Sequence, residues 1–269
     1  MLRRTEMLRL LLERLSRGVV LKRRLPSEFG GLALFVSPDA SLKYWRRDLR
    51  NTDSALLDAA KFLVDPGDVV WDVGANIGLF SFASAGLAGA AGQVLAIEPD
   101  PWLSDLLRRS VDLNGNSGCS VHVLPVAIGD QMGEAVLNIA RRGRATSYIS
   151  GHEPSTQTGG VRSCVRVKSV TLDGLLDHWA APSVVKIDVE GAEVSVLCGA
   201  QKLLRDSRPK ILCEVSKENR DEATSILRTA KYELFDAARP LRGAAPLAQC
   251  AWNTIALPIG GDHSEQWFA

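Results

Sequence analysis

The fold is decided by the stretch VVWDVGANIG, residues 69–78. Its first half is apolar apart from one aspartate, which is typical of a strand that is buried on both faces. Gly74 and Gly78 then bracket a turn, where a missing side chain lets a ligand approach the backbone. Small apolar residues follow and predict a helix over 77–90, whose first N–H groups would point at a ligand above the turn.

A second apolar run, residues 94–97, ends in Glu98. An acidic residue about 20 positions beyond the glycine turn can accept hydrogen bonds from both hydroxyls of a ribose. Asp72, at the end of the first strand, would repel a pyrophosphate and attract the amino group of a methionine moiety. The two acids therefore favour S-adenosylmethionine over a nicotinamide or flavin nucleotide, and a turn without any ligand is the least favoured interpretation.

Strands and helices alternate along most of the chain, which predicts a doubly wound, Rossmann-like α/β fold with a seven-stranded sheet. The strands expected in this sheet are 69–73, 93–97, 120–126, 183–188, 210–215, 231–236 and 251–257. The helices expected are 54–64, 77–90, 102–113, 172–179, 192–204 and 219–230. Because only a loop joins the last two strands, one of them is expected to run antiparallel to the rest.

The alternation is interrupted at about residues 134–170. Strands expected at 135–140 and 161–170 would form an inserted β-hairpin, and the connection 141–160 is polar and rich in Gly, Ser and Thr. A connection of about 20 residues in a compact domain is more often a functional lid than a spacer. We therefore expect this insertion to cover the acceptor of the reaction.

Residues 1–53 are expected to form an extension that precedes a catalytic domain of residues 54–269. Eight basic side chains and leucines at helical spacing predict a basic amphipathic helix over 1–24. This helix could lie on an anionic membrane surface, or pack on the catalytic domain or on a second subunit such as that of a homodimer. Residues 32–36 and 42–45 are expected to pair as a short hairpin.

Composition argues against several classes of protein. The net charge of +1 argues against a general nucleic-acid binder. The five cysteines form no C-x-x-C pair, which is typical of reduced thiols in a cytoplasmic protein. No apolar run reaches about 18 residues, so no membrane span is expected, and only a peripheral membrane contact stays open.

A second informative stretch is VVKIDVEGAE, residues 184–193. Asp188 ends this strand, Lys186 would share its face, and Glu190 projects from the turn that follows. Ligands of open α/β sheets gather outside the carboxyl ends of the strands, so these side chains are candidates for catalysis. Glu193 is expected to be a helix-start acid without a role in the site.

A divalent metal is the less favoured interpretation of these acids. Asp188 and Glu214 would be neighbours at adjacent strand ends, as in magnesium-dependent catechol-type enzymes. No third ligand follows either residue at a suitable position. We therefore expect no metal.

Taken together, the chain resembles the FkbM family of S-adenosylmethionine-dependent methyltransferases. The resembling motifs are Asp72–Gly78, Ile97–Pro101, Val126–Asp130, Val170–Asp173, Lys186–Glu193 and Asn253. The resemblance implies a class I methyltransferase fold and transfer of a methyl group to a hydroxyl oxygen. The acceptor would be a small molecule or a glycan: a sugar, a glycoconjugate or a secondary metabolite.

The resemblance also implies the site residues. Those expected to bind S-adenosylmethionine are Asp72, Gly74, Ala75, Asn76, Gly78, Glu98, Pro99, Ala127 and Asp188. Those expected to be catalytic are Asp188, Glu190 and Lys186, with the acids as proton acceptors and His152 as a weaker rival. Two other functions stay open: an RNA ribose 2′-O-methyltransferase, and a non-catalytic subunit that binds the cofactor.

Overall fold

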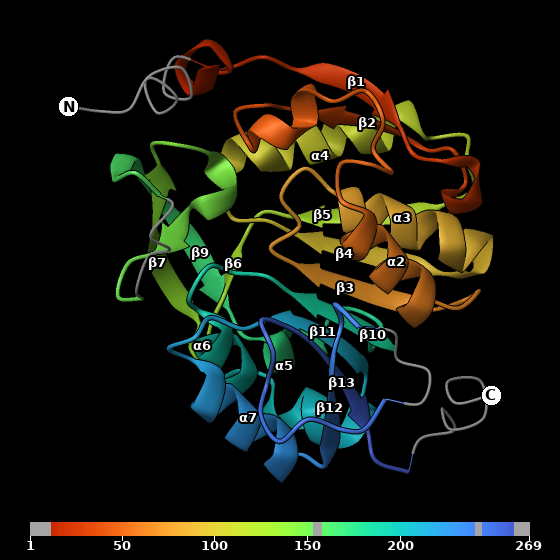
Figure 1. Ribbon diagram of the computed structural model, residues 1–269, viewed down its shortest axis with the longest axis vertical. Coiled ribbons are helices and arrows are strands. Elements are labelled where there is room, and N and C mark those ends of the chain that lie inside the picture. The colour runs from red at the N-terminus through yellow and green to blue at the C-terminus, as the bar shows by residue number, and fades with distance from the viewer. Residues whose placement is uncertain (1–11, 153–157, 240–243, 261–269) are drawn as a thin grey trace.

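The computed structural model describes residues 12–152, 158–239 and 244–260. Its centre is a seven-stranded sheet with the strand order β12-β13-β11-β10-β3-β4-β5 (Figure 1). The strands are β3 (Val69–Val73), β4 (Gln93–Ile97), β5 (Ser120–Leu124), β10 (Val184–Ile187), β11 (Lys210–Glu214), β12 (Tyr232–Asp236) and β13 (Asn253–Pro258). The strands from β11 to β5 pair in parallel, whereas β13 runs antiparallel to both of its neighbours.

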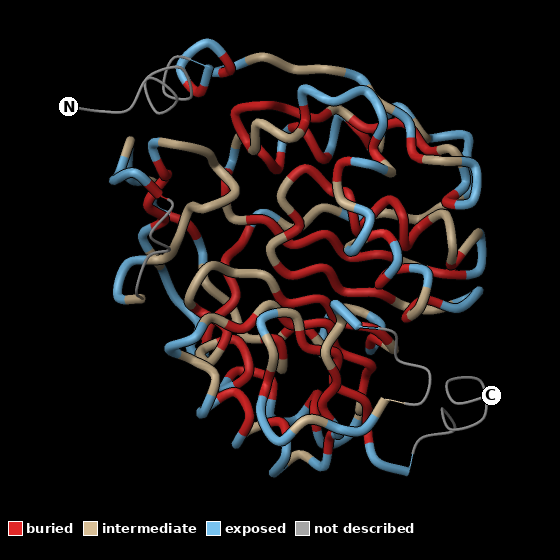
Figure 2. The backbone as a smooth tube through the Cα atoms, viewed as in Figure 1, coloured by how far each residue is buried: buried red, intermediate tan, exposed pale blue. Residues whose placement is uncertain are grey.

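Helices cover both faces of the sheet (Figure 1). The helices of one face are α2 (Ser54–Leu63), α3 (Leu79–Ala88) and α4 (Pro101–Leu113), and those of the other are α5 (Leu172–Leu175), α6 (Glu193–Cys198) and α7 (Arg220–Thr229). Alternate strand residues divide between two cores: Val70 packs with α2 and α3, and Trp71 packs with α6. The central strands are therefore buried on both sides, as Figure 2 shows.

The insertion forms a second sheet, which lies beside the first (Figure 1). Its strands are β6 (Ala127–Ile128), β7 (Gly133–Ala140), β8 (Tyr148–Ile149) and β9 (Val161–Val170), in the order β6-β9-β7-β8. The long strands β7 and β9 pair antiparallel. The connection expected as an irregular loop contains β8 and the short 3-10 helix η4 (Arg144–Thr146), and its residues 153–157 lie outside the described part.

The hairpin predicted near the N-terminus has a different partner strand. Strand β2 (Ala33–Val36) pairs antiparallel with β1 (Leu21–Arg24), whereas the second predicted strand is the 3-10 helix η2 (Leu42–Trp45). Chain reversal between β1 and β2 uses η1 (Ser27–Phe29) and two glycines with positive φ, Gly30 and Gly31. The turn at residues 27–31 therefore pairs β2 with β1, and the turn after β2 does not form a hairpin.

The helix predicted over residues 1–24 is wrong in its C-terminal half. The described helical residues end at Leu15, and Gly18 follows with a φ of 71°. Residues 21–24 alternate between half-buried and exposed, which is the pattern of a strand with one covered face. Residues 1–11 lie outside the described part.

The helix predicted over 192–204 is interrupted. It ends at Cys198, and a π-helical turn, η5 (Leu203–Ser207), completes the segment. Gly199 lies at the break, where an added Cβ would come 2.1 Å from the carbonyl oxygen of Gly129. Among the described helices, none combines the length and the apolar character needed to cross a bilayer.

Candidate functional site

Two cavities adjoin each other at the carboxyl ends of the central strands. The η2 cavity, about 260 Å³, lies between η2, the start of α2 and the ends of β10 and β11. The lid cavity, about 70 Å³, lies between the end of β4 and the inserted sheet. Residues that line both are Gly74, Asn76, Ala145, Asp188 and Glu190.

Most of the predicted site residues line these cavities. The η2 cavity is lined by Gly74, Ala75, Asn76, Lys186, Asp188 and Glu190, and the lid cavity also by Glu98, Pro99 and Ala127. Asp72 and Gly78 line neither cavity, and the same is true of His152, which faces a third cavity near Asp130.

The glycine turn is held close to the end of β10. Gly74 has a φ of 76°, and an added Cβ would lie 1.8 Å from the carbonyl oxygen of Asp188. Gly78 has a φ of 86°, and its Cβ would lie 2.5 Å from a methyl group of Leu107 on α4. Gly78 is therefore needed for helix packing, whereas Gly74 lets two strand ends meet at the cavity.

Glu98 is fixed by backbone groups at the lid cavity. Its Oε2 accepts a hydrogen bond from the N–H of Asn76, and its Oε1 accepts one from the N–H of Asp100, both at 2.8 Å. Burial raises the pKa of Glu98 to about 8, although these two N–H groups act in the opposite direction. The Oδ1 of Asn76 is buried without a hydrogen-bond partner. The Oδ1 of Asn76 is thus a hydrogen-bond acceptor, beside Glu98, that the protein itself leaves for a ligand.

Asp72 is compensated by protein groups. It is fully buried, its Oδ2 accepts a hydrogen bond from Ser81 at 2.5 Å, and its Oδ1 lies 3.1 Å from the Nζ of Lys186. The same ammonium group donates to the carbonyl oxygen of Gly74 at 3.1 Å and lies 3.3 Å from Asp188. Asp72 therefore lines neither cavity, and its charge is paired with Lys186, which does line the η2 cavity.

Burial alone would lower the pKa of Lys186, but Asp72 and Asp188 together raise it above its ordinary value. Lys186 is therefore a permanent cation in the lining of the η2 cavity, although it is only 4% exposed. Its contacts also fix the relative positions of the glycine turn and the end of β10.

Three carboxyl groups meet at the η2 cavity: Asp188, Glu190 and Glu214. Burial, and after it the charge of Asp188, raise the pKa of both glutamates to about 8. Glu190 adopts a φ of 49°, which turns the chain sharply after β10. Near neutral pH the two glutamates hold protons, so they can donate hydrogen bonds to a ligand oxygen.

Glu193 has a larger structural role than a helix-start acid. It is 2% exposed, and its carboxylate accepts hydrogen bonds from the N–H of Gly191 at 2.7 Å and from Asn219 and Ser216 at 2.6 and 3.2 Å. These bonds fix the turn that carries Glu190. The prediction that its charge is of no consequence overlooked partners more than 20 residues away in sequence.

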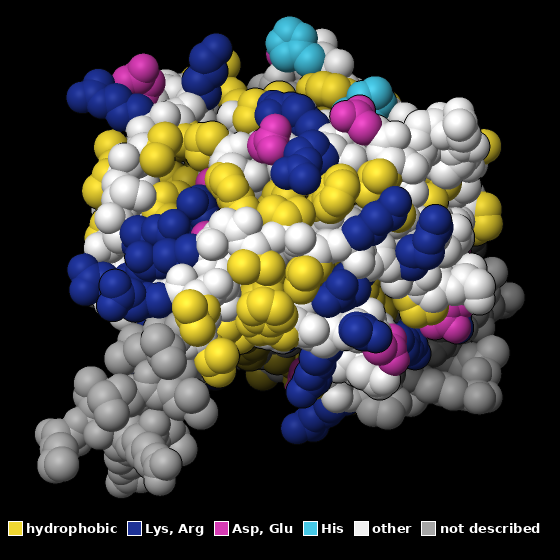
Figure 3. Space-filling view, turned by 90° about the horizontal axis from the view of Figure 1, so that it is seen from above, with side chains coloured by type: hydrophobic (Ala, Val, Ile, Leu, Met, Phe, Trp, Pro, Cys, Tyr) yellow, Lys and Arg dark blue, Asp and Glu magenta, His cyan; other side chains and the backbone are white. Residues whose placement is uncertain are grey.

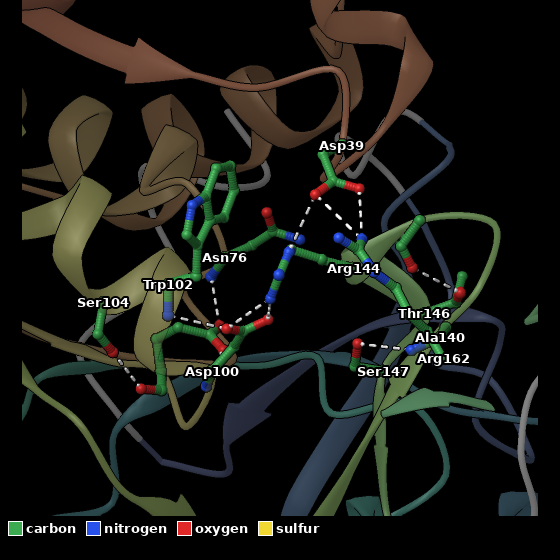
Figure 4. A network of polar contacts seen from close by, with 12 residues as sticks. Asp39, Asn76, Asp100, Trp102, Ser104, Ala140, Arg144, Thr146, Ser147 and Arg162 are labelled. Atoms are coloured by element: carbon green, nitrogen blue, oxygen red, sulfur yellow. Dashed lines mark hydrogen bonds and ion pairs between the residues drawn. The ribbon is translucent and has the colours of Figure 1, made fainter. Parts of the chain in front are cut away.

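The insertion contributes an arginine, with 14% of its side chain exposed, that sequence reasoning missed. The guanidinium of Arg144 binds Asp100 at 2.6 Å and Asp39 at 3.2 Å, and it lies 4.7 Å from the ring of Trp102 (Figure 4). Arg162 of β9 binds Asp39 from the other side at 2.9 Å. These contacts join the lid, the segment before η2 and the start of α4.

The segment around η2 was also missed as part of the site. Tyr44 is buried and lines the η2 cavity, and Lys43 beside it binds Asp53 at 2.5 Å. Asp53 is the N-cap of α2, a role that its position before Ser54 indicates in the sequence. The residues of η2 carried no such signal.

The seven-stranded sheet and the two cavities at its strand ends define a Rossmann-like methyltransferase. Residues 72–241 match the model of the methyltransferase FkbM domain, and the chain belongs to this family. It is similar to the hexuronic acid methyltransferase AglP of Haloferax volcanii, with 27% identity over 223 residues that cover 73% of this chain and 85% of that protein. The chain is therefore an enzyme of the methyltransferase class.

The solved structures that resemble this chain have lower sequence identity to it. The methyltransferase FkbM from Methylobacillus flagellatus has a TM-score of 0.44 and 16% identity, over 81% of this chain and 57% of that one. An S-adenosylmethionine-dependent O-methyltransferase from Thermotoga maritima has a TM-score of 0.41 and 12% identity, over 76% of this chain and 63% of that one. The chain thus spans little more than half the length of the first structure.

Proposed function

We propose that this protein is an S-adenosylmethionine-dependent O-methyltransferase that acts on a hydroxyl group of a sugar or glycoconjugate. The observation that carries the proposal is the cluster of Asp188, Glu190 and Glu214 in a cavity that adjoins the Glu98 pocket. The family and the relative that acts on a hexuronic acid support it.

The residues at the lid cavity fit S-adenosylmethionine. Glu98, whose pKa burial raises to about 8, would exchange hydrogen bonds with the ribose hydroxyls, and Pro99 and Ala127 would flank the adenosine. Gly74, Ala75 and Asn76 would hold the methionine part, where the unpartnered Oδ1 of Asn76 can accept from an ammonium group. Asp72 would act indirectly, by holding Lys186 and the carbonyl oxygen of Gly74 in place.

When bound, S-adenosylmethionine supplies a methyl group that is already activated by the adjacent sulfonium charge. The protein is left to orient the acceptor hydroxyl and to remove its proton. Asp188 is suited to accept the proton, because 36% of its side chain is exposed to the cavity side and Lys186 fixes its other oxygen. Glu190 and Glu214, protonated near neutral pH, would donate hydrogen bonds that hold the acceptor.

A polyhydroxylated acceptor suits the lining of the η2 cavity. Besides the three carboxyl groups, the cavity presents the polar side chains of Ser41, Lys43 and Asn253. Such a wall can accept and donate many hydrogen bonds, as sugar hydroxyls require. Lys43 is the group that would face an acceptor carboxylate, since the ammonium group of Lys186 is already shared by Asp72 and Asp188.

The proposal is tested with a panel of glycosides and methyl-labelled cofactor. We expect transfer to hexose or hexuronic acid glycosides and a product with the label on oxygen, identified by nuclear magnetic resonance. Deoxy analogues that lack one hydroxyl would identify the position. Transfer only to a nitrogen or carbon acceptor, or to RNA alone, would contradict the proposal.

A further inference from the structure

Charge is divided unevenly between the N-terminal segment and the rest of the chain. Residues 12–50 contain nine Lys and Arg side chains against four Asp and Glu, whereas residues 51–269 contain 20 against 26. The segment forms an outer layer, because β1 and β2 lie across α4 (Figure 1), where the N–H of Phe35 binds Ser110. One face of the protein is therefore basic, and the body behind it is acidic.

The basic side chains of this layer are largely exposed. Those exposed to solvent are Arg14, Arg17, Lys22, Arg24, Arg46 and Arg47. Of the four acids, Glu13 and Asp39 are buried, which leaves only Glu28 and Asp48 exposed. Figure 3 shows this face from above, with more Lys and Arg than Asp and Glu side chains among apolar ones.

Apolar side chains are exposed within the same layer. Leu15 is 64% exposed, Trp45 45% and Leu12 42%. The indole N–H of Trp45 donates to the Oγ of Ser16 at 3.1 Å, so the end of the helix and η2 lie side by side. Leu15 and Trp45 therefore share one surface, flanked in sequence by Arg17 and Arg47.

We propose that this surface, residues 12–24 and 45–47, docks on anionic lipid bilayers. Leucine and tryptophan side chains enter the boundary between headgroups and acyl chains, and flanking Lys and Arg bind anionic headgroups. Each basic residue near an anionic leaflet strengthens binding about fivefold. The acidic body is repelled by the same leaflet, so the charge division also fixes the orientation. Exposed leucines offer nothing to nucleic acid, which is bound through phosphates and base stacking.

Docking would bring the η2 cavity to the membrane. Helix η2 presents Lys43 and Tyr44 to the cavity, and the next residue, Trp45, is exposed on the docking surface. A bilayer under Trp45 therefore lies one short helix away from the cavity. If the proposed function holds, the acceptor is a glycan carried on a lipid; that consequence rests on the proposed function, whereas docking itself does not.

The test is co-sedimentation of the full chain with vesicles of phosphatidylcholine alone or mixed with phosphatidylglycerol. We expect binding only to the mixed vesicles, and weaker binding as salt rises. The double variant Arg17→Glu/Arg47→Glu should bind at least about 25-fold more weakly, because two attractive charges are lost and two repulsive ones added. Leu15→Gln should reduce the binding that persists at high salt.

The matched control is Lys202→Glu/Lys217→Glu, with the same change of charge at two exposed lysines beside α6 and α7, at the other end of the molecule (Figure 1). Its binding should stay within about twofold of the wild type. Equal binding of all proteins, or binding that ignores phosphatidylglycerol, would overturn the proposal. It would also be overturned if the wild type left vesicles unbound and shifted an RNA oligonucleotide that the Arg17→Glu/Arg47→Glu variant did not. No acceptor or methyl transfer enters the assay, so a wrong proposed function leaves its result unchanged.

Discussion

At the scale of single residues, Lys186 matters most. Its ammonium group contacts Asp72, the carbonyl oxygen of Gly74 and Asp188, and it is 4% exposed. A buried cation of this kind costs desolvation, which is offset only while its partners are present. The same contacts therefore stabilise the fold and hold Asp188, the proposed proton acceptor, in position.

We expect Lys186→Met to lower the free energy of unfolding by about 3–5 kcal/mol, because Asp72 is left as an unpaired charge without contact to water. Lys210→Met is the matched control. Lys210 is nearly as buried as Lys186, but its shortest printed contact, 2.9 Å, is with Asp65, which has 64% of its side chain exposed, and Asp68 lies farther away at 3.7 Å, so water can replace the shorter contact. Urea denaturation of both variants provides the comparison. A loss as large in Lys210→Met as in Lys186→Met would contradict this account of Lys186.

Three of the predicted site residues that line the cavities lie within a few positions of the end of a central strand. Glu98, Asp188 and Glu190 could be found because the end of a buried apolar run is visible in sequence. The compensation of Asp72 by Lys186 could not, because it joins two strands 114 residues apart whose adjacency only the sheet order reveals.

At the scale of elements, Arg144 attaches the insertion, the proposed lid, to the rest of the described chain. Its guanidinium contacts Asp100 and Asp39, and the backbone N–H of Arg144 donates to the carbonyl oxygen of Asp39 at 2.9 Å. Arg144, Tyr148 and Ile149 also line the lid cavity. The contacts that hold the lid are therefore continuous with the proposed cofactor site.

We expect Arg144→Ala to speed hydrogen exchange of the amides in residues 141–152 and to weaken cofactor binding, because the nearly buried Asp100 loses its cation. Arg166→Ala is the control: Arg166 lies on β9, 83% of its side chain is exposed, and its contact with Glu134 is 3.7 Å long. Exchange in the Arg166→Ala variant should match the wild type. Unchanged exchange in Arg144→Ala would show that the lid is held by its strands alone.

The elements that could be predicted are those whose local pattern decides their structure. Strands β3, β4, β10 and β11 are apolar runs covered on both faces, so their positions were found to within a few residues. The pairing of β2 was predicted wrongly, with residues 42–45, because residues 21–24 were assigned to the basic helix and the pairing depends on the glycine turn between 21–24 and β2. Residues 21–24 were not predicted as a strand because their three basic side chains fitted the pattern of the basic helix.

At the scale of the whole molecule, three glutamates with raised pKa values link stability to pH. Burial raises the pKa values of Glu98, Glu190 and Glu214 from 4.5 to about 8. Between these values the unfolded chain releases protons that the folded protein retains. The free energy of unfolding contributed by these groups is therefore present below about pH 4.5 and is lost as the pH rises through 8.

We expect the melting temperature of the ligand-free protein to fall between pH 5 and pH 8.5, because the three buried glutamates lose their protons over this range. Glu98→Gln cannot lose a proton, so its melting temperature should fall less over the same range. Glu233→Gln, at an exposed position of β12, is the control and should follow the wild type. If the melting temperatures of the wild type and of Glu98→Gln changed equally with pH, this would contradict the buried, protonated state of Glu98.

The central claim is that Glu98 and Asn76 bind the cofactor while Asp188 acts on the acceptor. It is tested by measuring, for Asp188→Asn, both the calorimetric affinity for S-adenosylhomocysteine and the turnover number at saturating cofactor. Asp105→Asn, at an exposed position of α4, is the control and should change neither. We predict an affinity within about threefold of the wild type and a turnover number lowered by about 10²-fold or more, the range expected when a general base is lost. Loss of cofactor binding with an unchanged rate for the cofactor-bound enzyme would contradict the claim.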